Sequence, residues 1–132
     1  MNEQERIEQG AQTRREVLGS AYVDSARAAA DEFTQPWQEY VTARAWHDIW
    51  NRPGLDRRTR SMINLAMLAA LGRAHELPLH VRGALRNGVT PEELREIFIQ
   101  VAGYAGFPAG VDAFRAAQPL VAEFRSGAFS TD

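Results

Sequence analysis

The chain has 132 residues, a length that fits one domain with a substantial core but not two independent ones. Its apolar fraction of 45% and charged fraction of 24% are ordinary for a globular protein and unlike those of a disordered chain. A formal charge of −2 provides no overall positive field for nucleic acid, and the absence of cysteine excludes disulfides, thiolate nucleophiles and cysteine-bound metals. We therefore expect a single domain over residues 1–132.

No segment shows the strict alternation of a strand, and good helix formers dominate, so the sequence predicts an all-α fold. The first helix should run from about Glu3 to Leu18 and end at Gly19. A second should begin after Asp24, a favourable N-cap, and be interrupted at Pro36.

The segment from Pro36 to Trp50 carries apolar side chains at helical spacing, which predicts an aromatic-rich helical face. These side chains are Trp37, Tyr40, Val41, Ala45, Trp46, Ile49 and Trp50. Core packing is the simplest explanation of this face.

Residues 51–54 have the composition of a turn, and Asp56 should cap a helix that continues to Leu71. This helix is apolar nearly all round, so we expect it at the centre of the fold or at a subunit interface. Another helix should span about residues 76–87, with Pro78 in its first turn and Gly88 as its stop.

Thr90, Pro91 and Glu93 form the pattern of a capping box with proline at the first helical position. They predict a helix that ends near Tyr104. After a glycine-rich break, a last helix should run from roughly Ala109 to about residue 125. The side chains expected to point inward from it are Val111, Phe114, Leu120 and Phe124.

Six or so helices with short connections predict a compact bundle, and residues 126–132 should form a frayed tail. The first ten residues are polar and charged, so we expect neither a signal peptide nor a membrane anchor there. The longest apolar run, residues 65–71, is far shorter than the roughly 20 residues that span a bilayer. These features predict a cytoplasmic protein without a membrane partner.

Glu76 and His80 are the most informative local pair, because residues four apart at the start of a helix share one face. A carboxylate beside an imidazole can fix its tautomer and raise its pKa, which suits a general acid or base near neutral pH. The spacing alone favours a structural hydrogen-bonded pair over a functional one. A metal site is not expected, since His75 lies on another face and His47 is distant in sequence.

The sequence contains no lysine, so all 15 of its Lys+Arg residues are arginine, through codon usage or through the recognition of carboxylates by planar guanidinium groups. Most of these arginines should be solvated surface groups. Arg60, in the first turn of the very apolar helix, and Arg82, two residues after His80, are candidates for binding a carboxylate bidentately. Residues 103–108 form either a simple turn between helices or a close approach of backbone to a ligand.

Several separated segments, in the same order, closely resemble the 4-carboxymuconolactone decarboxylase family. They are residues 14–19 (RREVLG), 45–55 (AWHDIWNRPGL), 58–61 (RTRS), 76–82 (ELPLHVR) and 87–90 (NGVT). The resemblance covers nearly the whole chain. It implies an all-helical, alkylhydroperoxidase-D-like fold, a homo-oligomer expected to be a hexamer, and cofactor-free decarboxylation of a dicarboxylate lactone in protocatechuate breakdown. Peroxide-reducing members of the superfamily use a CxxC pair, which this chain lacks.

The chemistry of such a substrate implies roles for particular side chains. His80 is the predicted proton donor and Glu76 its orienting partner, while Arg60 and Arg82 are predicted to bind carboxylate and oxyanion groups. Trp46, Trp50 and Tyr104 are predicted pocket walls. Two alternatives remain open: a family member acting on a different carboxylated lactone, and a non-catalytic oligomer that binds a small ligand.

Overall fold

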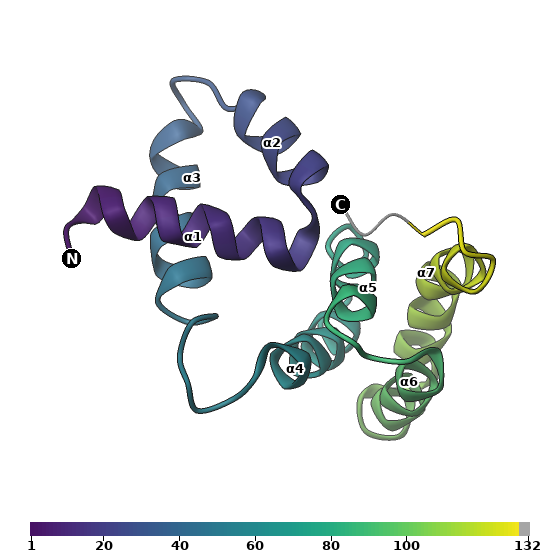
Figure 1. Cartoon of the computed structure of the whole chain (residues 1–132). Helices are drawn as coiled ribbons and strands as arrows, with labels where there is room; N and C mark the ends of the chain where they lie inside the picture. Colours follow the sequence, from purple (N-terminus) through teal and green to yellow (C-terminus); the bar gives the residue numbers. More distant parts are fainter. Residues whose placement is uncertain (130–132) are drawn as a thin grey trace. The chain divides into compact units, whose positions relative to one another are not determined.

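The computed structural model in Figure 1 describes residues 1–129 of the chain. These residues form seven α-helices and one π-helical segment and contain no strand, so the all-α prediction is confirmed. They belong to two compact units, an N-terminal unit of residues 1–56 and a C-terminal unit that begins at Arg57. The last three residues of the predicted frayed tail, 130–132, lie outside the described part of the chain.

The N-terminal unit begins with α1 (Glu3–Leu18), which has the predicted bounds. A capping box between Asn2 and Glu5 starts this helix, and Gly19, at φ 95°, ends it. The next helix, α2 (Ser20–Ala28), begins earlier than predicted. Because Gly19 turns the chain within one residue, Asp24 is not needed as a cap, and its carboxylate binds Arg15 at 2.8 Å instead.

The predicted helix over residues 36–50 is divided into α3 (Gln35–Val41) and the π-helical segment η1 (Thr42–His47). The amide of Asp48 donates to the carbonyl of Ala43, and that of Trp50 to the carbonyl of Ala45, both five residues earlier. Helix α1 crosses η1 (Figure 1), and the two backbones approach closely at Gly10. A Cβ atom on Gly10 would lie 2.1 Å from the carbonyl oxygen of Thr42.

The aromatic face of this region is only partly a core face. Trp46 and Trp50 are buried, as core packing predicts, whereas Trp37, Tyr40 and Ile49 are exposed. The extra residue in each π-helical turn rotates the following side chains relative to those of α3. The prediction of one continuous helical face from residue 36 to residue 50 is therefore wrong.

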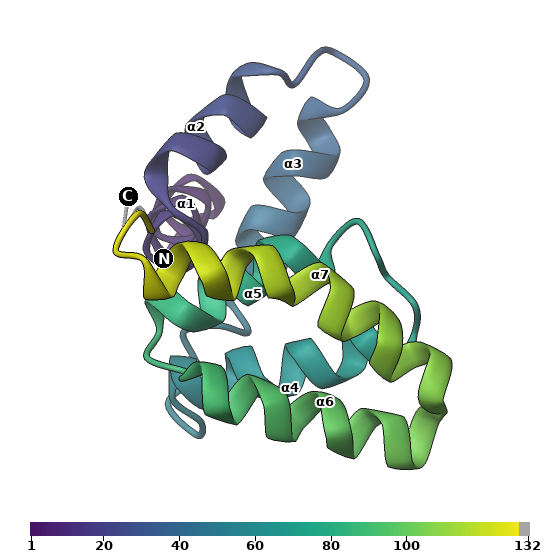
Figure 2. The same ribbon diagram turned by 90° about the vertical axis from the view of Figure 1, so that its right-hand side faces the viewer.

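The C-terminal unit consists of four helices, α4 (Arg57–Ala70), α5 (Leu77–Arg86), α6 (Pro91–Ala105) and α7 (Phe107–Arg125). Figure 2 shows α4 beside α6, with which it packs, and α7 in contact with α5. Thr90 and Glu93 form the predicted capping box, with reciprocal bonds of 3.1 and 3.0 Å. One apolar cluster, centred on Leu65, Val81 and Phe98, joins all four helices. Burying a side chain such as Phe98 contributes about 1.5–3 kcal/mol.

Helix α4 is buried on one face only, although its sequence is apolar nearly all round. Ser61, Leu65 and Ala69 are buried, while Ile63 and Met67 are exposed. Of the two predicted places for this helix, the centre of the fold is therefore wrong, and the subunit interface stays a prediction, since an apolar face of α4 is exposed in the single chain.

The inward face predicted for α7 is also wrong for most of its members. Val111, Phe114 and Phe124 are exposed, while Leu120 is half-buried against the core. The buried positions are instead the small residues Gly110, Ala113 and Ala117. A Cβ atom on Gly110 would lie 2.7 Å from the Cβ of Ala102, so α7 approaches α6 too closely for large side chains at the contact.

Candidate active site

Glu76 and His80 lie one helical turn apart at the start of α5. Pro78 occupies the first turn, where its missing N–H costs no helical hydrogen bond, and Glu76 is the N-cap residue. The backbone amide of His80 donates to the carbonyl of Glu76 at 3.2 Å. Glu76 is exposed, whereas His80 is half-buried where α5 enters the unit. As the sequence spacing predicts, Glu76 and His80 lie at the same end of one helix.

Burial lowers the pKa of His80 below its ordinary value, and the negative charge of Glu76 opposes this shift only in part. The carboxylate does raise the pKa, as expected, but the loss of solvation is the larger effect and the net shift is downward. Two consequences follow for chemistry. The imidazole of His80 is mostly neutral at pH 7, and its imidazolium is a stronger acid than that of a solvated histidine.

Arg82 does not share a face with His80, because residues two apart on a helix point in nearly opposite directions. One Nη atom of Arg82 lies 2.9 Å from a carboxylate oxygen of Glu123 on α7. Its guanidinium also lies over the ring of Phe129, 5.1 Å from the centroid. A substrate carboxylate at Arg82 would therefore have to share this guanidinium with Glu123.

Phe129 comes from the segment predicted to be frayed, but its ring has several contacts. It packs edge-on against Phe124 at a centroid distance of 5.4 Å and lies beneath the guanidinium groups of both Arg82 and Arg86. Cation–π contacts of this kind each contribute about 0.5–1 kcal/mol at partly exposed sites. The segment before residue 130 is thus attached to α5 and α7.

Arg60 lies in the first turn of α4, where it is half-buried. The same helix carries Arg58, which forms an ion pair with Glu93 of α6. Arg60 is therefore held on an element that is anchored to α6 at its N-terminal end.

Trp46 and Trp50 belong to the N-terminal unit. Their rings stack with centroids 5.2 Å apart and an interplanar angle of 15°, and each is only 7% exposed. Such a stacked aromatic pair contributes about 0.5–1.5 kcal/mol beyond the apolar area that it buries. Most of the surface of both rings is therefore buried by other residues of the same chain.

Tyr104 lies in the last turn of α6 and is 89% exposed. Phe107, three residues later at the start of α7, is also exposed. Gly106, at φ 110°, makes the sharp turn between the two helices. In the described part of one chain the ring of Tyr104 therefore faces solvent, and as a pocket wall it would need another surface against it.

His47, considered from the sequence only as a metal ligand, is a further candidate because it has a carboxylate partner. Its Nδ1 atom lies 2.7 Å from Oδ1 of Asp48. This contact is the largest cause of the lowered pKa of Asp48, and a hydrogen bond from Arg44 lowers that pKa further. Adjacent residues of an α-helix do not face each other, so helical spacing does not predict a contact between His47 and Asp48. Residues 1–129 contain no group of three or more His, Asp or Glu side chains able to hold a metal ion.

Comparison with known proteins identifies the family. The sequence profile of the carboxymuconolactone decarboxylase family matches residues 35–119, a range that contains all seven predicted site residues. The chain belongs to this family. A 4-carboxymuconolactone decarboxylase of Acinetobacter baylyi is 42% identical over 120 residues, which cover 91% of this chain and 90% of that protein.

A second relative comes from Metarhizium robertsii. This nitrosuccinic acid decarboxylase is 42% identical over 115 residues, which cover 87% of the present chain and 80% of the relative. Both relatives are named for the loss of CO2 from a carboxylic acid. No helix in the described part of the chain is long and apolar enough to cross a membrane.

Proposed function

We propose that this protein is a carbon–carbon lyase that converts 4-carboxymuconolactone to beta-ketoadipate enol-lactone and CO2 without a cofactor. The observation that carries the proposal is the pair Glu76 and His80 at the start of α5, with a lowered pKa at His80, in a chain of this family. The 42% identity to a decarboxylase named for this substrate, over nine-tenths of both chains, supports the choice of lactone.

The substrate supplies its own electron sink. It carries one carboxylate on the ring carbon bonded to the ring oxygen and a second on an acetate arm. When the carbon–carbon bond to the ring carboxylate breaks, CO2 leaves, and the electron pair moves through the conjugated double bond to the lactone carbonyl. The resulting dienolate then accepts a proton at the carbon next to the carbonyl. The protein has to bind the carboxylates, stabilise the dienolate and deliver this proton.

In this proposal the imidazolium of His80 delivers the proton. Burial makes it a stronger acid, while Glu76 keeps a larger fraction of it charged than burial alone would allow. Arg60 and Arg82 are assigned to bind the carboxylate and oxyanion groups of the substrate. Arg82 would bind them while it is also paired with Glu123. Trp46, Trp50 and Tyr104 are assigned to the pocket walls, because a dry environment speeds the loss of a carboxylate as CO2.

We also propose that the protein forms homo-oligomers. Large apolar side chains are exposed on the described part of one chain, among them Ile63 and Met67 of α4 and Phe107 of α7. A second copy placed against them would remove apolar surface from water at about 25 cal/mol per Å². Light scattering should give a mass at least twice the 14.7 kDa of one chain, and a monomeric mass would contradict the assignment.

The function is tested by supplying freshly generated 4-carboxymuconolactone to the purified protein while released CO2 and ultraviolet absorbance are followed. We expect one CO2 for each lactone consumed. Nitrosuccinate serves as the comparison substrate, because the second relative is named for it. A kcat/KM for nitrosuccinate above that for the lactone would overturn the proposed substrate, and inactivity on both, in a well-folded protein, would favour a ligand-binding role.

The pH dependence provides a separate test of the roles of Glu76 and His80. If the imidazolium is the donor, kcat should fall as the pH rises through the pKa of His80. Replacing Glu76 by glutamine removes the charge that raises this pKa, so the fall should move to lower pH. At pH 7.5 we expect kcat to decrease roughly two- to fivefold, the range given by an exposed charge pair.

Glu76→Asp keeps the charge and serves as the control for this experiment. It should keep the midpoint of the pH–rate profile near that of the unmodified protein. A midpoint that stays in place in Glu76→Gln, or moves to higher pH, would exclude Glu76 as the group that tunes His80.

A further inference from the structure

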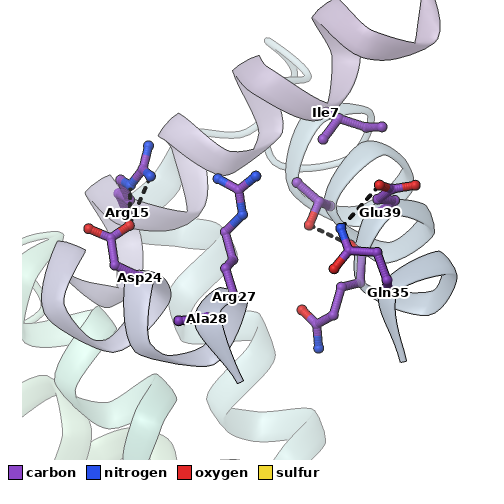
Figure 3. A pocket seen from close by; sticks show the side chains of 9 residues that line it. Ile7, Arg15, Asp24, Arg27, Ala28, Gln35 and Glu39 are labelled. Carbon is purple, nitrogen blue, oxygen red and sulfur yellow. Dashed lines mark hydrogen bonds and ion pairs between the residues drawn. The ribbon is translucent and has the colours of Figure 1, made fainter. Parts of the chain in front are cut away.

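A polar cavity of about 290 Å³ lies within the N-terminal unit, between α1, α2, α3 and the start of η1 (Figure 3). It contains none of the residues assigned to decarboxylation. The side chains that line it are Ile7, Arg15, Asp24, Arg27, Ala28, Gln35, Gln38, Glu39 and Thr42. Its volume is at the lower end of the range for pockets that bind small molecules.

Most of the polar groups around this cavity already have partners. Arg15 forms an ion pair with Asp24, with an Nη–Oδ1 distance of 2.8 Å. Glu39 accepts one hydrogen bond from the amide of Gln35, at 3.1 Å, which leaves its other carboxylate oxygen without a hydrogen bond from the described residues. These contacts hold both pairs against the walls on either side of the cavity.

Arg27 is different. Its guanidinium makes no hydrogen bond or ion pair with any residue of the described range 1–129, although Asp24 is on the same helix. Figure 3 shows it extending from α2 into the open space, with Glu39 on the opposite wall. Both side chains are exposed to solvent, so the cavity has on one wall a guanidinium without a carboxylate partner among the described residues and on the other a carboxylate with one oxygen available to a ligand.

We propose that this cavity binds a small zwitterion with a carboxylate at one end and an ammonium group at the other. The planar guanidinium of Arg27 suits a bidentate carboxylate, and Glu39 suits an ammonium group. The lining contains two arginines and two acidic residues, so a ligand with no net charge meets no net repulsion. A dicarboxylate would face Glu39 and Asp24, and a diamine would face both arginines.

Three probes with the same five-carbon chain separate these cases: 5-aminopentanoate, glutarate and pentane-1,5-diamine. Each is titrated calorimetrically into the full-length protein, and ω-amino acids of three to six carbons establish the preferred length. We expect saturable binding of an amino acid in this series, at least about tenfold tighter than that of the diacid or diamine of equal length. Failure of every amino acid to bind, or equal binding of all three classes, would overturn the proposal.

Two substitutions assign the ends of the ligand. Arg27→Gln should weaken binding of the amino acid about tenfold or more, and Glu39→Gln should weaken it while improving binding of glutarate. Arg73→Gln, which removes an exposed arginine outside the cavity, is the matched control and should leave binding unchanged. Unaltered affinity in Arg27→Gln would refute the site.

Decarboxylation in the Arg27→Gln protein distinguishes this cavity from the proposed active site. Because the two sites share no residue, kcat/KM for the lactone should stay within about twofold of the unmodified value. A large loss of kcat/KM in a folded protein would show that Arg27 serves the decarboxylation site, and would overturn the assignment of a separate ligand.

Discussion

Replacing His80 by alanine should lower kcat for CO2 release by about 10²–10⁴-fold, the usual contribution of a positioned general acid. KM should change much less, because the imidazole is assigned to a step after substrate binding. His80 is half-buried and lies in the first turn of α5, so the substitution leaves the core cluster of the C-terminal unit in place. Steady-state kinetics with the lactone, at several pH values, measures both quantities.

The chain offers a matched control for this experiment in His75. It is an exposed histidine five residues earlier, outside α5, and His75→Ala should keep full activity. Added imidazole should restore part of the activity of His80→Ala if proton delivery is what was lost. Unchanged turnover in His80→Ala would remove His80 from the mechanism and direct attention to His47, which lies against Asp48.

The fold could be predicted where local chemistry decides it. The capping box of Thr90 and Glu93 and the glycine stop at Gly19 involve residues no more than four apart in sequence, and both have the predicted geometry. The π-helical segment could not be predicted in this way. Its backbone packs against Gly10 of α1, more than thirty residues earlier, and helical periodicity carries no information about that contact.

The candidate site follows the same division. Glu76 and His80 are four apart, so helical spacing alone brought them together. The environment of Arg82 depends on Glu123, 41 residues later, and on Phe129, neither of which spacing can locate. The direction of the His80 pKa also required the structure, because burial by neighbouring helices outweighs the nearby carboxylate.

The second large effect is expected at Gly10. Replacing it by alanine should lower the free energy of unfolding by about 1–3 kcal/mol or more, the usual cost of overpacking. The new Cβ would lie 2.1 Å from the carbonyl oxygen of Thr42 and 3.2 Å from the amide nitrogen of His47. Both are backbone atoms, so no side-chain rotation relieves the overlap, and α1 and η1 must separate.

Gly103→Ala in α6 is the control that isolates this contact. Within a helix, alanine is favoured over glycine by about 1 kcal/mol, so helix propensity alone predicts that both substitutions stabilise the protein. A Cβ at Gly103 would meet nothing within 4 Å, and this variant should therefore gain about 0.5–1 kcal/mol. Urea unfolding of the two variants measures the difference. Opposite signs would demonstrate the close approach of α1 and η1, whereas stabilisation by both would show that α1 does not lie against Thr42.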